Sequence, residues 1–164
     1  MFEGAAVTVG LALVVAGCGG LPQAAGYGHR GQGFVVAFAE APTEHDFVLQ
    51  HPHTQYGTSI AHRTIWDGGN ATVWVDQLTA PVAPGHVDGF LRSYLPTATG
   101  GRMVTRFGLP AAIESIPCFT PAGSCPGNIA ELVILDHRTL YEVRATGAPG
   151  TDAAVLASFR PGGS

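Results

Sequence analysis

Histidine and carboxylate side chains are concentrated between residues 44 and 62, where they could bind a transition-metal ion. Four of the seven histidines lie there, and acidic residues flank the first of them, in the order Glu44, His45, Asp46, His51, His53, His62. Imidazole and carboxylate groups are ligands that zinc and copper take in proteins. No H-E-x-x-H or comparable spacing fixes their geometry, and Pro52 imposes an extended backbone. Two interpretations remain: a metal site with His45, His51 and His53 as ligands, or the favoured one, an exposed histidine-rich loop without metal.

Trp66 and Trp74 flank the turn Asp67-Gly68-Gly69-Asn70, and we expect them to lie at similar depths in the hairpin. Aromatic rings placed in this way can stack on a sugar ring or contact a lipid tail, which makes the two tryptophans candidate ligand-binding residues. The alternative, which is favoured, is a cross-strand aromatic pair that stabilises the hairpin.

Ser59, in the segment Gly57-Thr58-Ser59-Ile60-Ala61, partly resembles a nucleophile elbow. The final glycine of that motif is missing, and Ser59 is expected to open a strand rather than to occupy a strand-to-helix turn. We therefore expect no catalytic residue, no cofactor and no enzymatic activity.

Cys118 and Cys125 flank a segment that contains proline and glycine. In an exported protein, this arrangement is typical of a disulfide that closes a short loop, which the chain-entropy model values at about 2.5 kcal/mol. A redox or metal-binding pair is the alternative, but the C-x6-C spacing lacks the close C-x-x-C geometry.

The N-terminal segment has the pattern of an export signal followed by a flexible tether. Residues 5–17 are apolar or small, too few to cross a bilayer as a helix, and the tetrapeptide Val15-Ala16-Gly17-Cys18 resembles a bacterial lipobox. The resemblance implies cleavage before Cys18, acylation of Cys18 and a location on the extracytoplasmic face of the cell membrane. The expected organisation is a signal peptide at 1–17, a flexible glycine-rich tether at 18–33 and a single domain at 34–164. A buried apolar helix is the alternative for residues 5–17.

The composition excludes several classes of function. The formal net charge is −4, and all eight basic residues are arginines that form no cluster, so nucleic-acid binding is not expected. The absence of lysine excludes Schiff-base chemistry, a P-loop lysine and a Ser-Lys dyad. Frequent Ala, Gly, Pro and Arg without Lys is typical of a GC-rich genome and, together with the lipobox, points to an actinobacterium.

The pattern of apolar residues predicts an α+β domain with two main helices. An amphipathic helix is expected from Pro84 to Leu95, and a second from Asp152 to Phe159, capped by Thr151 or Asp152. Strands are expected at 34–39, 46–50, 58–66, 71–78, 102–107, 112–118, 129–135 and 140–146. Blocks of strands separated by single helices favour an antiparallel sheet of about six to eight strands packed with helices.

The two ends of this domain resemble PsbP-like domains. The C-terminal segments Leu140–Gly147 and Ala154–Arg160 are similar to the family patterns LYxVxxxG and FLxSFR, and Phe34–Pro42 is similar to its first strand, with Ala39 where a proline is common. The resemblance implies a PsbP-like sandwich, as in actinobacterial envelope lipoproteins of the LpqN type, and a binding or scaffolding role at a membrane.

The leading hypothesis is therefore a lipid-anchored, non-enzymatic binding or accessory protein. Its expected partner is a membrane-protein complex or an amphiphilic envelope lipid or glycolipid. The alternative is an extracytoplasmic metal-binding protein or metalloenzyme that uses the histidine-rich segment 45–62.

Overall fold

The computed structural model describes residues 27–31, 33–48, 56–97, 100–120, 123–147 and 150–162. Within these ranges the elements, in chain order, are β1 (Tyr27–Gly31), β2 (Phe34–Phe38), β3 (Thr43–Val48), β4 (Ile60–Asp67), β5 (Ala71–Leu78), the 3-10 turn η1 (Pro84–His86), α1 (Val87–Arg92), β6 (Arg102–Arg106), β7 (Leu109–Thr120), β8 (Gly123–Asp136), β9 (Thr139–Gly147), α2 (Thr151–Ser158) and β10 (Arg160–Pro161).

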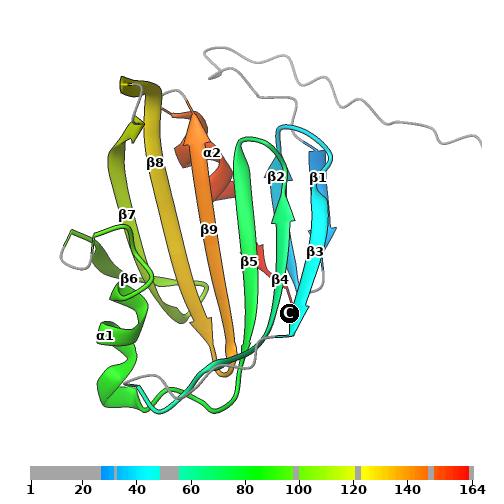
Figure 1. The fold of residues 1–164 in the computed structure, drawn as a ribbon. Coiled ribbons are helices and arrows are strands. Elements are labelled where there is room, and N and C mark those ends of the chain that lie inside the picture. Colours follow the sequence, from blue (N-terminus) through cyan, green and yellow to red (C-terminus); the bar gives the residue numbers. More distant parts are fainter. Residues whose placement is uncertain are drawn as a thin grey trace, which may run out of the picture.

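Seven strands form one antiparallel sheet in the order β3-β4-β5-β9-β8-β7-β6. Strands β1, β2 and β10 form a smaller sheet, which lies with α2 behind the large sheet in Figure 1, whereas α1 packs on the opposite face. The predicted α+β class, with six to eight antiparallel strands and two main helices, is confirmed.

The first hydrophobic core lies between the large sheet, the small sheet and α2. Aromatic rings occupy its centre: Phe34 meets Trp66 edge-on at a centroid distance of 4.8 Å and stacks on Phe159 at 6.0 Å. Tyr141 contributes a further ring, 5.7 Å from that of Phe159. These contacts fix α2 and β2 against the sheet, because rings of this size bury a large area in well-defined geometries.

The second hydrophobic core lies under α1, on the other face of the sheet. Phe90 and Leu91 of α1 are fully buried there against Val133 and Leu135 of β8. The alternate β8 residues, such as Leu132, belong to the first core. Both faces of β8 are thus covered, which explains its continuous apolar run.

The hairpin β4–β5 and helix α1 form close to where the sequence predicts them. The turn between the two strands has Gly69 at φ 80°, and a Cβ on Gly68 would lie 2.3 Å from the ring of Phe38, so both positions require glycine. Pro84 opens η1 directly before α1, as its fixed φ favours. The α-helix ends at Arg92, short of the predicted Leu95, although Leu95 is still buried in the second core.

Several predicted boundaries are wrong. The sequence assigns residues 27–31 to the flexible tether, but in the structure Tyr27–Gly31 form strand β1 and pair with β2. Backbone hydrogen bonds to this buried neighbour compensate for the weak strand propensity of the segment. The first hairpin strand starts at Ile60, and β3 starts at Thr43 rather than near Asp46. In addition, β7 starts at Leu109, because Phe107 and Gly108, with φ of 55° and 76°, make the turn alone.

The expected cap of the C-terminal helix is also wrong. Gly150, at φ 97°, precedes α2 instead of Thr151 or Asp152, and no side chain caps the helix. The Asp152 carboxylate instead accepts a hydrogen bond from the Gly150 N–H at 3.1 Å. A left-handed residue is accessible to glycine without the strain that a Cβ would introduce.

Candidate functional site

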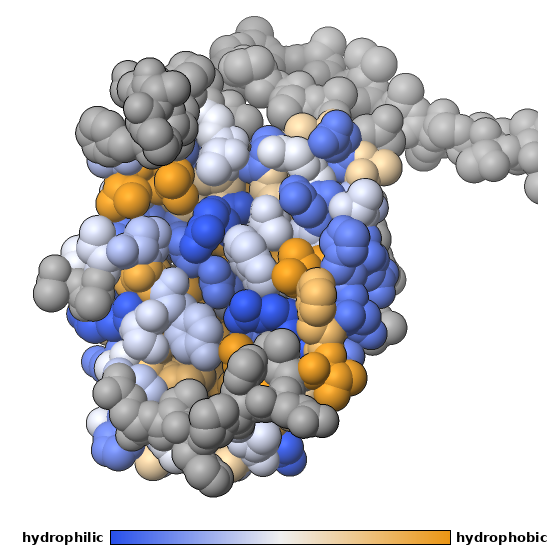
Figure 2. Space-filling view, in the orientation of Figure 1, coloured by the Kyte–Doolittle hydropathy of each residue, from blue (hydrophilic) through white to orange (hydrophobic). Residues whose placement is uncertain are grey.

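A buried network of acids and arginines crosses the face of the large sheet that α1 partly covers. We call it the charged face; it consists of Arg63, Asp76, Glu131, Glu142 and Arg144. Figure 2 views this side of the molecule and shows hydrophilic residues gathered over its central strands.

Arg63 and Asp76 lie directly opposite each other on β4 and β5 and form a two-point ion pair. The Arg63 Nε and Nη2 groups donate to the two Asp76 oxygens at 2.7 and 2.6 Å. Burial raises the pKa of Asp76, while the hydrogen bond and charge of Arg63 oppose that rise. Because the Asp76 side chain has no exposed surface, the pair is structural rather than a site for an external ligand.

Arg144 of β9 contacts two carboxyl groups at once. Its Nε lies 3.1 Å from Glu131, and its Nη2 lies 3.5 Å from Glu142. Burial, followed by the hydrogen bond and charge of Glu131, raises the pKa of Glu142 to about 8. At neutral pH Glu142 therefore keeps its proton, and Glu131 forms the ion pair with Arg144. Trp74 covers the assembly, with its ring 5.1 Å from the Arg144 guanidinium carbon.

Glu114 of β7 extends this row of acids and holds the loop that follows α1. It lies opposite Glu131 in the strand pairing. The Thr97 backbone N–H donates to its carboxylate at 2.9 Å, and the Thr97 hydroxyl also donates to it. These bonds attach the loop to the sheet and leave little of the Glu114 carboxylate for a ligand, so the charged face as a whole stabilises the fold.

An open cavity of about 540 Å³ lies on the other face of the sheet, between α2 and strands β6 to β8. We call it the α2 groove. Its lining residues are Gly100, Arg102, Arg106, Ile113, Glu114, Ser115, Ala130, Asp152, Ala153, Leu156 and Ala157. The volume falls within the ~300–1,000 Å³ typical of small-molecule sites, and an apolar surface with a few polar groups is their usual lining.

Arginines of the edge strand β6 supply the positive charge of the α2 groove. Arg102, Val104 and Arg106 alternate along β6, so all three project to the same side of the sheet. Val104 packs against the first core, which identifies that side as the one facing α2. Among the described residues, neither arginine has a carboxylate within ion-pair distance.

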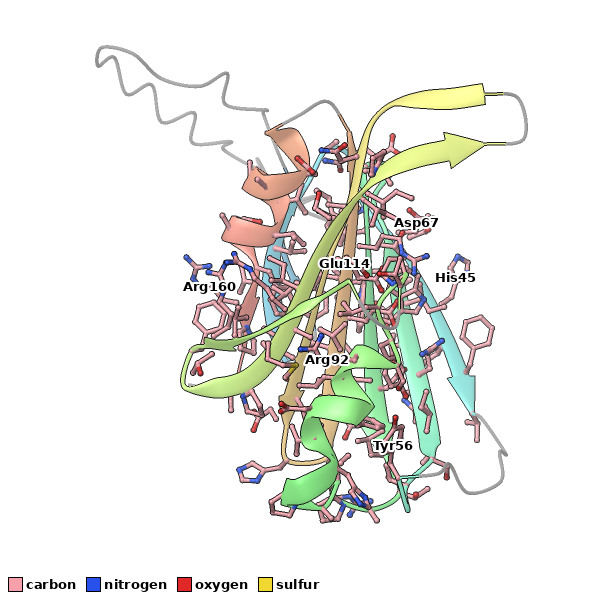
Figure 3. All side chains as sticks on the ribbon, turned by 90° about the vertical axis from the view of Figure 1, so that its left-hand side faces the viewer. His45, Tyr56, Asp67, Arg92, Glu114 and Arg160 are labelled. Carbon is pink, nitrogen blue, oxygen red and sulfur yellow. The ribbon has the colours of Figure 1, made fainter. Side chains whose placement is uncertain are left out.

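The two ends of the α2 groove differ in charge. Asp152, in the first turn of α2, lines the groove together with Arg102. At the other end, the Arg160 guanidinium lies 5.1 Å over the ring of Phe107, the residue after Arg106. Figure 3 views the sheet from its β6 edge and shows Arg160 beside the end of α2.

The two tryptophans named as ligand-binding candidates lie on opposite faces of the sheet. Trp66 pairs with Val73 and is buried in the first core, whereas Trp74 pairs with Ile65 and faces Arg144. A shared stacking platform and a cross-strand aromatic pair both require the two rings on one face. The prediction of a cross-strand aromatic pair is therefore wrong, and the two rings form no shared platform. Ligand binding by the tryptophans stays a prediction.

The predicted histidine cluster is divided in the same way. Asp46 lies opposite Thr64 and contacts His62 at 3.3 Å, whereas the adjacent His45 lies opposite Ile65 and projects to the other face. His51 and His53 lie outside the described residues. Within the described ranges, no three His, Cys, Asp or Glu side chains are placed to hold a metal ion.

The Ser59 hydroxyl, which the sequence compares with a nucleophile elbow, lies 3.2 Å from the Thr79 hydroxyl and hydrogen-bonds to it.

The pairing of β7 with β8 shifts register between Pro117 and Phe119, so it does not define a partner for Cys118. The disulfide between Cys118 and Cys125 stays a prediction. Cys18, with the proposed signal peptide, lies outside the described residues. No helix in the described part of the chain is long and apolar enough to span a membrane.

The α2 groove is not predicted by the sequence. The alternation Arg102-x-Val104-x-Arg106 was available as a signal, but it indicates a groove only when α2 is known to lie opposite β6. Comparison with known proteins gives no further guide, because no family model, curated protein or solved structure significantly matches this chain.

Proposed function

We propose that this protein is a lipid-anchored extracytoplasmic binding protein that holds an amphiphilic ligand in the α2 groove and catalyses no reaction itself. The α2 groove is the observation that carries the proposal. It combines an apolar wall, which includes Ile113 and Leu156, with Arg102 and Arg106, which form no ion pair with any residue that the structure describes. An amphiphile has the matching division into an apolar chain and a polar head.

The sequence supports the anchored location. The lipobox-like tetrapeptide that ends at Cys18 follows an apolar segment with the length of a signal peptide core. Two or more acyl chains on Cys18 would hold the domain stably at a membrane, where amphiphiles and membrane-protein complexes are both available. The PsbP-like resemblance of residues 34–161 fits the same role.

A tryptophan placed in the α2 groove tests the binding site. Ala153 and Ala154 are adjacent and exposed on α2, but only Ala153 lines the groove. We expect Ala153→Trp to reduce the fluorescence gain of the uncharged probe Nile red at least several-fold, because the indole fills the space the probe would occupy. Ala154→Trp is the matched control and should bind the probe as the parent protein does. Equal binding by both variants would exclude the groove as the site.

A substitution at Cys18 tests the anchor. We expect Cys18→Ser to move the protein from the membrane fraction to the soluble fraction, with loss of the acyl mass from the N-terminal peptide in mass spectrometry. A native N-terminus that starts at Met1 and carries no acyl group would contradict the anchored location and leave the binding test unaffected.

A further inference from the structure

The chemistry of the α2 groove specifies which kind of amphiphile fits it. Given the proposed binding function, the charge of the ligand follows from the arginines of β6, the apolar wall opposite them and the unequal charge of the two ends.

The arginines of β6 lack a protein counter-charge. Arg102 and Arg106 are exposed, and among the described residues neither forms an ion pair. The other arginines of the sheet, Arg63 and Arg144, are bound to buried carboxylates. Guanidinium groups bind carboxylate and phosphate oxygens with directed, charge-assisted hydrogen bonds, so an anionic group is the complement of this strand.

The apolar wall requires more than a simple anion. Ile113 and Ala130 of the sheet face Leu156 of α2 across the groove. Ala130 and Leu156 are already buried, whereas Ile113 is half-buried and Ala153 and Ala157 of α2 are exposed. An inorganic anion would leave these exposed apolar groups in contact with water, whereas an alkyl chain would bury them. The volume of about 540 Å³ suits one chain with its head better than a whole two-chain lipid.

The position of the head follows from the charges at the two ends. Asp152 lies among the lining residues with Arg102 and would repel an anion there. Arg160 lies over Phe107 next to Arg106, which adds a second positive charge at the opposite end. The Arg106 end is therefore the more favourable place for an anion.

We propose that the α2 groove binds a single-chain amphiphile with an anionic head group. The head interacts with Arg106, with a weaker contribution from Arg102, and the chain lies between Leu156 and the sheet residues Ile113 and Ala130.

Calorimetric titration with probes of equal chain length tests the inference. The protein is the full chain carrying Cys18→Ser, purified without detergent, and the probes are decanoate, decanol and decyltrimethylammonium, each below its aggregation concentration. We expect decanoate to bind most tightly and its affinity to fall with added salt, because the ion pair is exposed to solvent. Inorganic phosphate should bind far more weakly than decanoate.

Charge-removing variants locate the head. We expect Arg106→Gln to weaken decanoate binding about tenfold and Arg102→Gln to weaken it less, while decanol binding stays unchanged. Arg138→Gln removes the same charge from the β8–β9 turn, away from the groove, and should bind decanoate normally. The melting temperature of each variant shows that it is folded.

The possible failures are distinguishable. If the three decyl probes bind equally, or both arginine variants keep the parent affinity for decanoate, the anionic head is wrong while the binding function stands. If phosphate binds as tightly as decanoate, the site takes a simple anion and the chain has no role. If no decyl probe and no Nile red bind, the proposed function fails as well.

Discussion

Glu131 and Glu142 lie on the neighbouring strands β8 and β9, share a hydrogen bond and both contact the guanidinium of Arg144. One positive charge thus faces two buried carboxyl groups. Only one of them is ionised at neutral pH, because a second buried negative charge would have no partner of its own. The proton on Glu142 is therefore part of the folded structure.

This proton makes stability depend on pH. The pKa of Glu142 is about 8 in the folded protein, compared with the usual 4.5 of an unfolded chain. From pH 4.5 to 8 the unfolded chain loses this proton while the folded protein keeps it, so the free energy of unfolding falls as pH rises. The fall is at most about 1.4 kcal/mol per pH unit and ends above pH 8.

Glu142→Gln isolates this contribution, because an amide keeps a donor for Glu131 and an acceptor for Arg144 without a titrating proton. We expect urea unfolding of Glu142→Gln to show a flatter pH profile between pH 5 and 9 and higher stability than the parent at pH 9. Glu40→Gln, at an exposed position, is the control and should follow the parent profile. Parallel profiles for all three proteins would contradict the shared proton.

The Arg63–Asp76 pair predicts a strong coupling energy. Arg63→Met leaves the fully buried Asp76 carboxylate without its partner, and we expect a loss of about 3 kcal/mol in the free energy of unfolding. Asp76→Leu combined with Arg63→Met removes both charges and should be less destabilising than the sum of the two single changes. Additive losses in chemical denaturation would mean that the pair is not coupled.

The two tryptophans are expected to differ in their contribution to stability. Trp66 is 1 % exposed and packs against Phe34, so Trp66→Ala should lower the free energy of unfolding by about 3–5 kcal/mol. Trp74→Ala removes a partly exposed ring above Arg144, and a loss of about 1 kcal/mol is expected. Urea denaturation measures both. A larger loss for Trp74→Ala would contradict the assignment of the two faces.

The positions of Cys118 and Cys125 on either side of a segment with proline and glycine predict that they form a disulfide in the exported protein. Its reduction should lower the free energy of unfolding by about 2.5 kcal/mol. Alkylation of the unreduced, denatured protein followed by mass spectrometry measures it directly, since neither cysteine should be labelled. A Cys118→Ser, Cys125→Ser double variant should be insensitive to reducing agent, and full labelling of the native protein would exclude the bond.

Local patterns in the sequence identify most of the strands and both helices. Asp67-Gly68-Gly69-Asn70 can only be a turn between the strands it joins, and the spacing of Val87, Phe90 and Leu91 is that of a helix with one buried side. The strand order is not encoded locally, because β5 and β9 pair across a long stretch of chain. For the same reason the groove between β6 and α2 was not predictable.

The charged residues show a second limit of local patterns. Glu131 looks like an exception inside an apolar strand, and only the neighbouring Arg144 explains its complete burial. Glu142 and Arg144 alternate with apolar residues as if exposed, yet α1 and the loop after it cover much of that face. Trp66 directly precedes its turn, whereas three residues separate Trp74 from it. Trp74 therefore lies one step beyond Val73, the partner of Trp66, and the two rings project to opposite faces.

The position of β9 at the centre of the sheet governs how the chain can assemble. The hairpin β4–β5 is complete long before residue 139 is synthesised, and the β7–β8 hairpin is complete just before it. Each hairpin then ends in an unpaired strand until β9 joins them. Premature truncation would expose two hydrogen-bonding edges that recruit other chains. The molecule therefore closes its sheet last, from the carboxyl end, and must stay protected from aggregation until that strand arrives.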